Sequence, residues 1–257
     1  MIEEYLSGLR LSQLPQLDEA MRYALAGGKR FRARLCLAAA GAVGADPREA
    51  LPAAAALELI QAFSLVHDDL PALDDDEQRR GRPTAHVAFG EAVAILAGDG
   101  LLNAAFRVVD ELPAERRPAV VGELAAGVAG MIDGQYLDIT ADAQPSLDEL
   151  RRLHRLKTGA LIGAAVGCGL HVGGADEERQ RPYRAYAAEI GLLFQIVDDL
   201  LDEGADGEPS YVTSVGRERA RELAAQAHSA ALARLAEADG ETAELSALAD
   251  QIASRTA

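Results

Sequence analysis

The chain has 257 residues, of which 49% are hydrophobic, and its formal net charge is −16. A chain of this length and composition can bury one large core, and no stretch of it resembles a linker, so we expect a single domain over residues 1–257. The acidic charge argues against nonspecific binding to nucleic acid or to anionic membranes, because both require a basic protein face.

Targeting signals and membrane spans are not expected. Residues 1–4 are acidic where a secretory signal would be basic, and the longest charge-free apolar runs, such as 160–170, are too short to cross a bilayer. We therefore expect a cytoplasmic protein without a stable membrane anchor. Cys36 and Cys168 stand singly in apolar stretches, so both should be buried small side chains.

An all-α fold is predicted, because apolar residues recur at spacings of three and four over most of the chain. Prolines punctuate this pattern and separate its segments. The segments with helical periodicity cover 17–27, 31–44, 49–70, 86–110, 115–140, 147–173, 180–203, 216–236 and 240–254. Alanine and glycine runs in the central segments allow close packing, as in a large helical bundle whose active-site cavity lies between helices.

A basic segment, Gly-Gly-Lys-Arg-Phe-Arg at 27–32, opens the second predicted helix. Its backbone amides and the side chains of Lys29 and Arg32 could hold a phosphate group. Lys29 and Lys157 are the only lysines in a chain that otherwise uses arginine, which suggests that both positions require lysine. Thr158 follows Lys157 and adds a hydroxyl donor beside the charge.

The first acidic motif, Asp-Asp-Leu-Pro-Ala-Leu-Asp-Asp-Asp at 68–76, ends a predicted helix. Carboxylates repel one another and resist desolvation, so this density of acidic residues needs a cation or abundant water. Pro71 should interrupt the helix, because it lacks an amide hydrogen and clashes with the preceding turn. A local kink then sets the spacing from Asp68 to Asp74.

Two neighbours of this motif are of interest. A basic turn at 79–84 carries Arg79 and Arg80 and could neutralise a diphosphate bound at the motif. The alternative is that it balances the acidic charge alone. His67 directly precedes Asp68, but adjacent helical residues point about 100° apart, so we expect a structural role for it.

The second acidic motif, Asp-Asp-Leu-Leu-Asp, begins 130 residues after the first. Asp198 and Asp202 are four residues apart and share a helix face with Gln195, whereas Asp199 is offset by about 100°. Mg²⁺ prefers oxygen ligands and takes only one or two protein carboxylates when phosphates complete its shell. Two such motifs together indicate a diphosphate–metal cluster, whereas either alone could be a solvated helix end.

These segments together closely resemble the trans-type isoprenyl diphosphate synthases of the polyprenyl synthetase family, and the bacterial farnesyl diphosphate synthases in particular. The resemblance runs from about Met21 to the C-terminus. It is carried by residues 27–32, 64–81, 90–99, 134–135, 157–159 and 194–199. Any one of these segments alone would be a weak signal, but the set is specific.

The resemblance implies an all-α prenyltransferase, usually a homodimer, that joins isopentenyl diphosphate head to tail to dimethylallyl or geranyl diphosphate. By that likeness, three Mg²⁺ ions on the allylic diphosphate are held by Asp68, Asp74, Asp198 and Asp202. The allylic substrate is bound by Arg79, Lys157, Thr158 and Gln195. Isopentenyl diphosphate is bound by Lys29, Arg32, Gln61 and Arg80. Catalysis depends most on Asp68, Asp74, Asp198 and Lys157.

The implied mechanism needs no side-chain base. Mg²⁺ assists departure of the allylic diphosphate, the isopentenyl double bond attacks the resulting cation, and released diphosphate removes the proton. Phe63, five residues before Asp68, is where a bulky ring limits chain growth in this family. With the Pro71-Ala72 insertion it resembles the pattern of fifteen-carbon producers, so farnesyl diphosphate is the expected product. The alternative for Phe63 is an ordinary core side chain.

Two departures from the family pattern bear on activity. Gln61 stands where bacterial relatives usually carry histidine, although eukaryotic relatives carry glutamine. The loop after Asp202 is short and has no lysine, where the family has a Gly-Lys pair and a second lysine. Each lost charge-assisted contact costs about 1.5–3 kcal/mol. A terpene cyclase-like enzyme and a non-catalytic subunit of a heteromeric synthase therefore stay open as alternatives.

Overall fold

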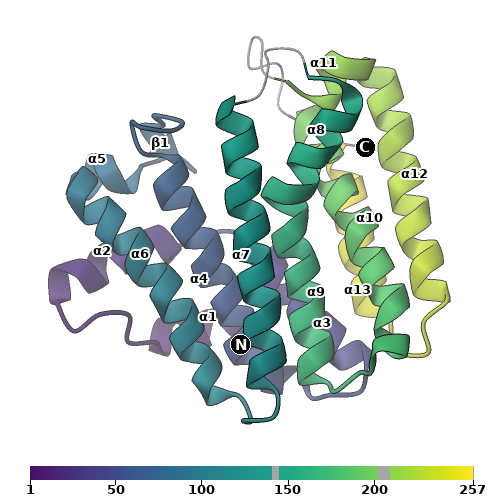
Figure 1. The fold of residues 1–257 in the computed structure, drawn as a ribbon, viewed down its shortest axis with the longest axis horizontal. Helices are drawn as coiled ribbons and strands as arrows, with labels where there is room; N and C mark the ends of the chain where they lie inside the picture. Colours follow the sequence, from purple (N-terminus) through teal and green to yellow (C-terminus); the bar gives the residue numbers. More distant parts are fainter. Residues whose placement is uncertain (141–144, 202–208, 257) are drawn as a thin grey trace.

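Helices dominate the fold (Figure 1). The structure, a computed structural model, describes residues 1–140, 145–201 and 209–256. Its α-helices are α1 (Ile2–Gly8), α2 (Pro15–Leu25), α3 (Phe31–Ala42), α4 (Leu51–Asp68), α5 (Ala85–Phe89), α6 (Glu91–Val108), α7 (Arg117–Thr140), α8 (Leu147–His154), α9 (Ala160–Val172), α10 (Glu177–Leu201), α11 (Tyr211–Val215), α12 (Arg217–Ala236) and α13 (Ala243–Ala253). The shorter elements are the 3-10 turns η1 (Pro47–Ala50), η2 (Val109–Glu111) and η4 (Ser254–Thr256), the π-helical η3 (Arg155–Gly159), and strands β1 (Gln78–Arg79) and β2 (Arg82–Pro83).

The all-α prediction is confirmed, and most helices lie where the periodicity placed them. The short helices α1 and α11 were not predicted, because seven and five residues are too few to display a periodic pattern. The segment predicted as one helix over 86–110 is divided at Gly90, whose φ of 86° is outside helical geometry. The segment predicted over 147–173 contains the π-helical turn η3 between α8 and α9.

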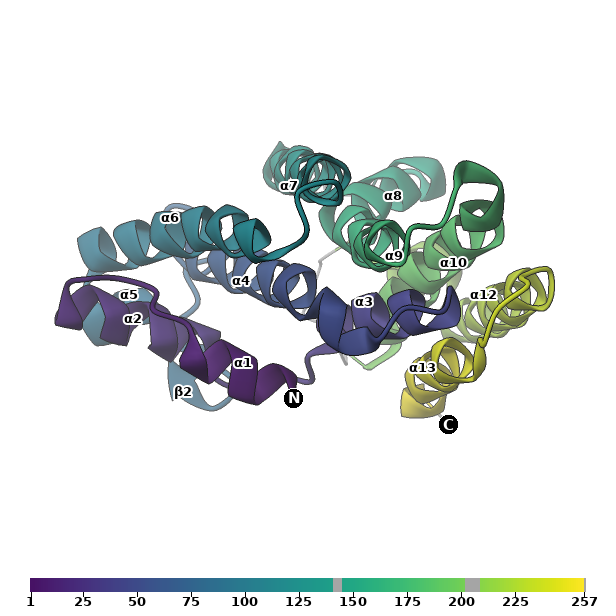
Figure 2. The ribbon, with the colours of Figure 1, turned by 90° about the horizontal axis from the view of Figure 1, so that it is seen from below.

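The central helices lie close together because their facing side chains are small. In Figure 2, α4 lies between α6 on one side and α1 and α2 on the other, and α9 lies between α7 and α10. A Cβ atom at Gly169 of α9 would collide with the Cys36 carbonyl of α3, so glycine permits this approach. Cys36 and Cys168 are both buried free thiols, as predicted.

Two helices are long and apolar enough to cross a membrane by length and composition. They cover Pro47–Asp68 and Glu91–Glu111, and this corrects the expectation that the apolar runs are too short, which counted charge-free runs alone. The first span is 78% buried inside the protein and the second 44%. Burial of this extent is what a core helix requires, so the composition of α4 follows from packing.

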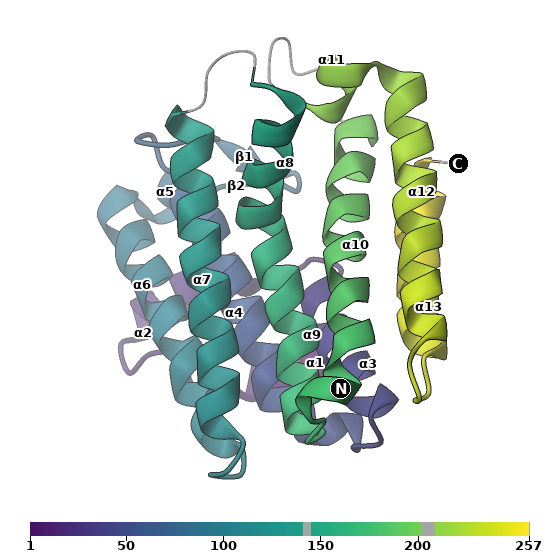
Figure 3. The ribbon, with the colours of Figure 1, turned by 45° about the vertical axis from the view of Figure 1, so that its right-hand side comes forward.

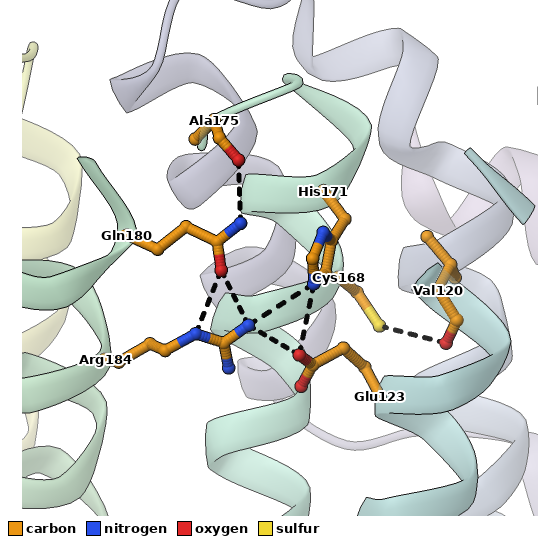
Figure 4. Close-up of polar contacts among 7 residues, drawn as sticks. All are labelled: Val120, Glu123, Cys168, His171, Ala175, Gln180 and Arg184. Carbon is orange, nitrogen blue, oxygen red and sulfur yellow. Dashed lines mark hydrogen bonds and ion pairs between the residues drawn. The ribbon is translucent and has the colours of Figure 1, made fainter. Parts of the chain in front are cut away.

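Polar side chains link three helices at the end of the bundle where α9 finishes (Figure 4). Arg184 of α10 donates to Glu123 of α7 (2.6 Å) and to Gln180 (2.7 Å). His171 Nε2 of α9 lies 3.3 Å from the same Glu123 carboxylate, and Gln180 donates to the Ala175 carbonyl (2.7 Å). The network holds α7, α9 and α10 together. Along α10, Arg184 lies about 20 Å from Asp198 of the second acidic motif.

Candidate active site

The first acidic motif lies where α4 ends. The helix finishes at Asp68 and Pro71 follows in a turn, as the missing amide hydrogen of proline predicts. The backbone amide of Asp74 donates to the Asp68 carbonyl (2.9 Å), and that of Asp75 donates to the Leu70 carbonyl (3.2 Å). The turn thus closes on itself and brings Asp68 and Asp74 within electrostatic reach of each other.

Both of these carboxyl groups resist ionisation. Burial raises the pKa of Asp68 to about 6; the Lys157 ammonium opposes this shift and the neighbouring Asp74 carboxylate adds to it. Burial also raises the pKa of Asp74. A divalent cation would relieve the desolvation and the mutual repulsion of such a pair.

The raised pKa of Asp68 predicts how stability depends on pH in the absence of metal. A carboxyl group whose folded pKa lies near 6, above its ordinary 3.8, stabilises the fold below about pH 4 and loses that contribution as pH rises through 6. Replacing Asp68 by asparagine should remove this component. We expect thermal unfolding in EDTA to show a smaller stability loss between pH 4 and 7 for Asp68→Asn than for the unchanged protein. Identical pH profiles would contradict it.

The basic turn forms a short hairpin. Strands β1 and β2 pair, with positive φ at Arg80 (55°) and Gly81 (72°) between them. Arg79 Nε donates to Asp69 Oδ1 (2.7 Å), which ties the hairpin to the end of α4. The Arg80 guanidinium lies over Gly28, where a Cβ atom would come within 2.9 Å of it. The hairpin therefore carries Arg80 across to the Gly-Gly segment.

The second acidic motif divides its two described carboxylates between different roles. Asp199 is buried and accepts hydrogen bonds from the Tyr211 amide (2.7 Å) and from Gln195 Nε2 (3.1 Å). Asp198 accepts a hydrogen bond from Arg255 (2.8 Å). Asp199 thus fixes the surroundings of the motif, while Asp198 faces a cation.

Two residues of this site were not predicted, and one predicted metal ligand, Asp202, is not described by the structure. Arg255 pairs with Asp198 across 57 residues of sequence, and no local pattern signals such a contact. Asp138 on α7 forms an ion pair with Lys157, and spacing alone does not relate them. Asp202 and residues 203–208, where the lysine-free loop begins, lie outside the described residues.

Lys157 and Thr158 stand on the π-helical turn η3. Lys157 pairs with Asp138 and lies near enough to Asp68 and Asp74 to feel their charge, which together with the pairing raises its pKa despite burial. Thr158 Oγ1 donates to Gln195 Oε1 (3.0 Å). Single π turns occur often at functional sites. Here η3 faces the first motif through Lys157 and the second motif through Thr158.

A cavity of about 250 Å³ brings together the basic residues around the Gly-Gly segment. Its lining includes Lys29, Arg32, Gln61, Arg80 and Asp198. Arg32 Nε is buried and has no hydrogen-bond partner among the described residues, and burial lowers the pKa of this guanidinium. A buried guanidinium nitrogen without a hydrogen-bond partner favours an anionic ligand, although Glu58 and Asp198 partly offset the charge of Arg32.

Gln195 contacts Asp199 rather than sharing a role with Asp198. It was expected on the face of Asp198, whereas its side-chain amide donates a hydrogen bond to Asp199.

Phe63 is buried on α4, and its ring contacts the His67 ring edge-on, with 5.0 Å between the ring centroids. His67 Nε2 in turn lies 3.1 Å from the Ile95 carbonyl of α6, which fits the expected structural role.

The carboxylates suit a hard divalent cation such as Mg²⁺. Among the described residues, no three His, Cys, Asp or Glu side chains converge closely enough to hold a metal by themselves. This arrangement fits an ion that takes one or two carboxylates and completes its shell with phosphate oxygens. Asp68 and Asp74 on one side and Asp198 on the other offer oxygen donors of this kind, and burial raises the pKa of both Asp68 and Asp74.

Known proteins are similar to this chain in sequence and in fold. A model of the polyprenyl synthetase family matches residues 14–250. Farnesyl diphosphate synthase of Geobacillus stearothermophilus is 42% identical, over 96% of this chain and 91% of its own. Chloroplastic geranylgeranyl pyrophosphate synthase of Catharanthus roseus is 42% identical, over 93% of this chain and 74% of its own.

Solved structures agree with the sequence relatives. A crystal structure of an FPP/GFPP synthase from Zymomonas mobilis superposes with a TM-score of 0.91 at 36% identity, covering 98% of this chain and 94% of that one. The resemblance read from the acidic motifs is therefore confirmed over almost the whole length. The chain belongs to the polyprenyl synthetase family, and it is a prenyltransferase that lengthens an allylic diphosphate head to tail.

Proposed function

We propose that this prenyltransferase adds isopentenyl diphosphate to dimethylallyl and geranyl diphosphate and stops at farnesyl diphosphate. The observation that carries the proposal is the cavity lined by Asp198, in which Arg32, whose buried Nε has no hydrogen-bond partner among the described residues, lies with Lys29 and Arg80. In a chain of net charge −16, such a local concentration of cations favours an anionic substrate.

Isopentenyl diphosphate would bind in this cavity. Arg32 and Arg80 offer planar guanidinium groups suited to two phosphate oxygens each, and Lys29 adds a compact charge. Gln61 lines the same cavity and can donate from its amide. These residues hold the diphosphate so that the double bond of the isopentenyl unit points towards the allylic carbon.

The allylic diphosphate would lie between the two acidic motifs. Its proposed metal ligands are Asp68, Asp74, Asp198 and Asp202. Three Mg²⁺ ions bound there would supply charge stabilisation for the departing diphosphate. Lys157 and Thr158, with Gln195 and Arg79, would orient the same group through direct hydrogen bonds.

Proton loss and exclusion of water complete the reaction. Released diphosphate, held by Lys157, is positioned to take the proton, so the site needs no side-chain base. The apolar helices beneath the motifs exclude water, which would otherwise capture the allylic cation as an alcohol. Arg255, paired with Asp198, is a cation that could compensate for the missing loop lysines.

The proposal is tested by incubating the protein with Mg²⁺, isopentenyl diphosphate and each of dimethylallyl, geranyl and farnesyl diphosphate. Mass spectrometry should find a fifteen-carbon diphosphate from the first two and little elongation of the third. Cyclic hydrocarbons would favour the cyclase alternative. Absence of any condensation, with Mg²⁺-dependent diphosphate binding retained, would favour a non-catalytic subunit.

Product length is predicted to depend on Phe63. Replacing it by alanine removes a buried ring that we propose as the floor of the chain-growth channel, so the main product should shift from fifteen to twenty or more carbons. Phe63→Tyr keeps the ring and should keep the fifteen-carbon product. The measurement is the product distribution at equal turnover. An unchanged distribution in Phe63→Ala would reduce Phe63 to a core side chain.

A homodimer and a single cytoplasmic domain belong to the same proposal. Large apolar side chains are exposed on α6 and α7, namely Ile95, Leu96, Val121, Ile132, Tyr136 and Ile139. Exposed apolar side chains in such number favour association with a second copy. Sedimentation should give the mass of two chains. The buried residues from Leu6 to Ile252 form one cluster, which supports one domain.

A further inference from the structure

A large groove among the described residues shares none of the residues proposed above as substrate or metal ligands. It has a volume of about 720 Å³ and runs between α8, η3 and α9 on one side and α10 on the other, with Tyr211 of α11 at one end. Figure 3 shows α8 and α9 beside α10, with α11 crossing above them. Pockets of about 300–1,000 Å³ are typical small-molecule sites.

The floor of the groove is apolar and made of small residues. Gly159, Ala160 and Gly163 contribute from the first side, and Ala188 and Gly191 from α10. A Cβ atom at Gly163 would meet nothing within 4 Å, so the space above this residue is open. Such a floor accepts a hydrocarbon chain and offers it no hydrogen bonds.

The rim of the groove is basic. Arg151, Arg152, Arg155 and Arg184 line it, against Asp148 and Glu189 as the acidic residues. Arg151 and Arg184 have carboxylate partners, at 3.6 and 2.6 Å. Arg152 and Arg155 make no side-chain hydrogen bond or ion pair within the described part of the chain. Two guanidinium groups are therefore available to an anion.

Two buried polar side chains that line the groove, His154 and Tyr211, indicate a ligand there. His154 is 9% exposed and Tyr211 is 0% exposed, and both line the groove. The His154 Nδ1 has no hydrogen-bond partner among the described residues, and the Tyr211 hydroxyl interacts there with Arg151, which can only donate to its oxygen and leaves its hydrogen available. Burial raises the pKa of Tyr211 to about 12, so this hydroxyl is a donor, and burial lowers the pKa of His154 to about 4, so its ring is neutral. Unpaired buried groups of this kind are rare in the absence of a partner.

We propose that this groove is a second binding site for a prenyl diphosphate. Its diphosphate would contact Arg152 and Arg155 and accept a hydrogen bond from Tyr211, while its hydrocarbon tail would lie along the floor past Gly163. The identity of the ligand rests on the proposed function, because the enzyme's own product combines an apolar chain with a diphosphate. No metal ligand of the active site lines this groove.

A ligand in the groove would affect the allylic site through two structural connections. The turn η3 lines the groove with Arg155 and Gly159 and carries Lys157 and Thr158 between them. On the other wall, the Tyr211 amide bonds Asp199, which is joined through Gln195 to Thr158. A ligand that shifts η3 or α11 therefore shifts the residues proposed to hold the allylic diphosphate. We expect inhibition by product that excess allylic substrate does not overcome.

The test is equilibrium binding of farnesyl diphosphate to the full chain in EDTA with isopentenyl diphosphate in excess. EDTA removes the metal-dependent active-site mode, and the excess isopentenyl diphosphate occupies the cavity of Lys29, Arg32 and Arg80. Farnesol and inorganic diphosphate serve as probes of the tail alone and of the head alone. Gly163→Phe fills the floor, and the double change Arg152→Ala with Arg155→Ala removes the free cations. Arg181→Ala, an exposed arginine of α10 outside the groove, is the matched control.

We expect one metal-independent site per chain that binds farnesyl diphosphate at least tenfold more tightly than either probe. Gly163→Phe should abolish this binding, and the double arginine variant should weaken it at least tenfold, with Arg181→Ala unchanged. At low product concentration, Gly163→Phe should turn over at the same rate as the unchanged protein. At high product concentration, the variant should no longer be inhibited. Absence of binding in EDTA, equal binding of either probe, or insensitivity to both variants overturns the proposal. The condensation assay on the same samples separates this result from failure of the proposed function.

Discussion

Replacing Asp68 by alanine should lower kcat/KM for condensation by about 10³-fold or more, because loss of a single group that stabilises developing charge already costs about 10²–10³. Asp68 is half-buried at the end of α4, close to Asp74 and Lys157, where burial raises its pKa to about 6. The measurement is the steady-state rate of isopentenyl incorporation over a range of Mg²⁺ concentrations. Higher Mg²⁺ should restore little activity, since a ligand is missing rather than weakened.

A second substitution in the same motif supplies the control. Asp75 is exposed and has a φ of 54°, a conformation that asparagine also tolerates. Asp75→Asn removes one negative charge from the motif without straining the turn, so its kcat/KM should change by less than about threefold. Equal losses in the two variants would show that total charge, and not the position of Asp68, sustains activity.

The sequence was sufficient for most helices because apolar residues recur at helical spacing over long segments that prolines separate. It was also sufficient for the interruption at Pro71, which depends on one local property of proline. It missed the division at Gly90 and the π-helical η3, since both depend on how the flanking helices pack. The π-helical turn η3 has about one residue more per turn than an α-helix, a difference too small and too local for helix propensity or apolar periodicity to reveal.

Within the candidate site, contacts along a helix could be predicted far better than contacts between helices. Gln195 was expected on the face of Asp198, about 60° away around the helix, but Asp199 at four residues is only about 40° away and takes the hydrogen bond. The pairs Asp198 with Arg255 and Lys157 with Asp138 join distant segments. Only the fold relates their positions, so no pattern in the sequence could have found them.

Among glycine-to-alanine changes near the site, Gly134→Ala should be the most disruptive. A Cβ atom there would overlap the backbone nitrogen and Cα of Lys157, so α7 and η3 would have to separate. Backbone cannot move aside as a flexible side chain can, and overpacking costs about 1–3 kcal/mol or more. We expect unfolding free energy to fall by about 3 kcal/mol. We also expect kcat/KM to fall by about 10²-fold, because Lys157 and Thr158 are displaced by about 1 Å.

Gly122 provides a control on the same helix. A Cβ atom at Gly122 meets nothing within 4 Å, so Gly122→Ala should raise stability by about 0.5–1 kcal/mol through helix propensity alone and leave activity unchanged. Chemical denaturation and condensation rates of the two variants give the comparison. If Gly134→Ala were as stable and active as Gly122→Ala, η3 would be free to move away from α7. The position of Lys157 would then not depend on the close approach of these two helices.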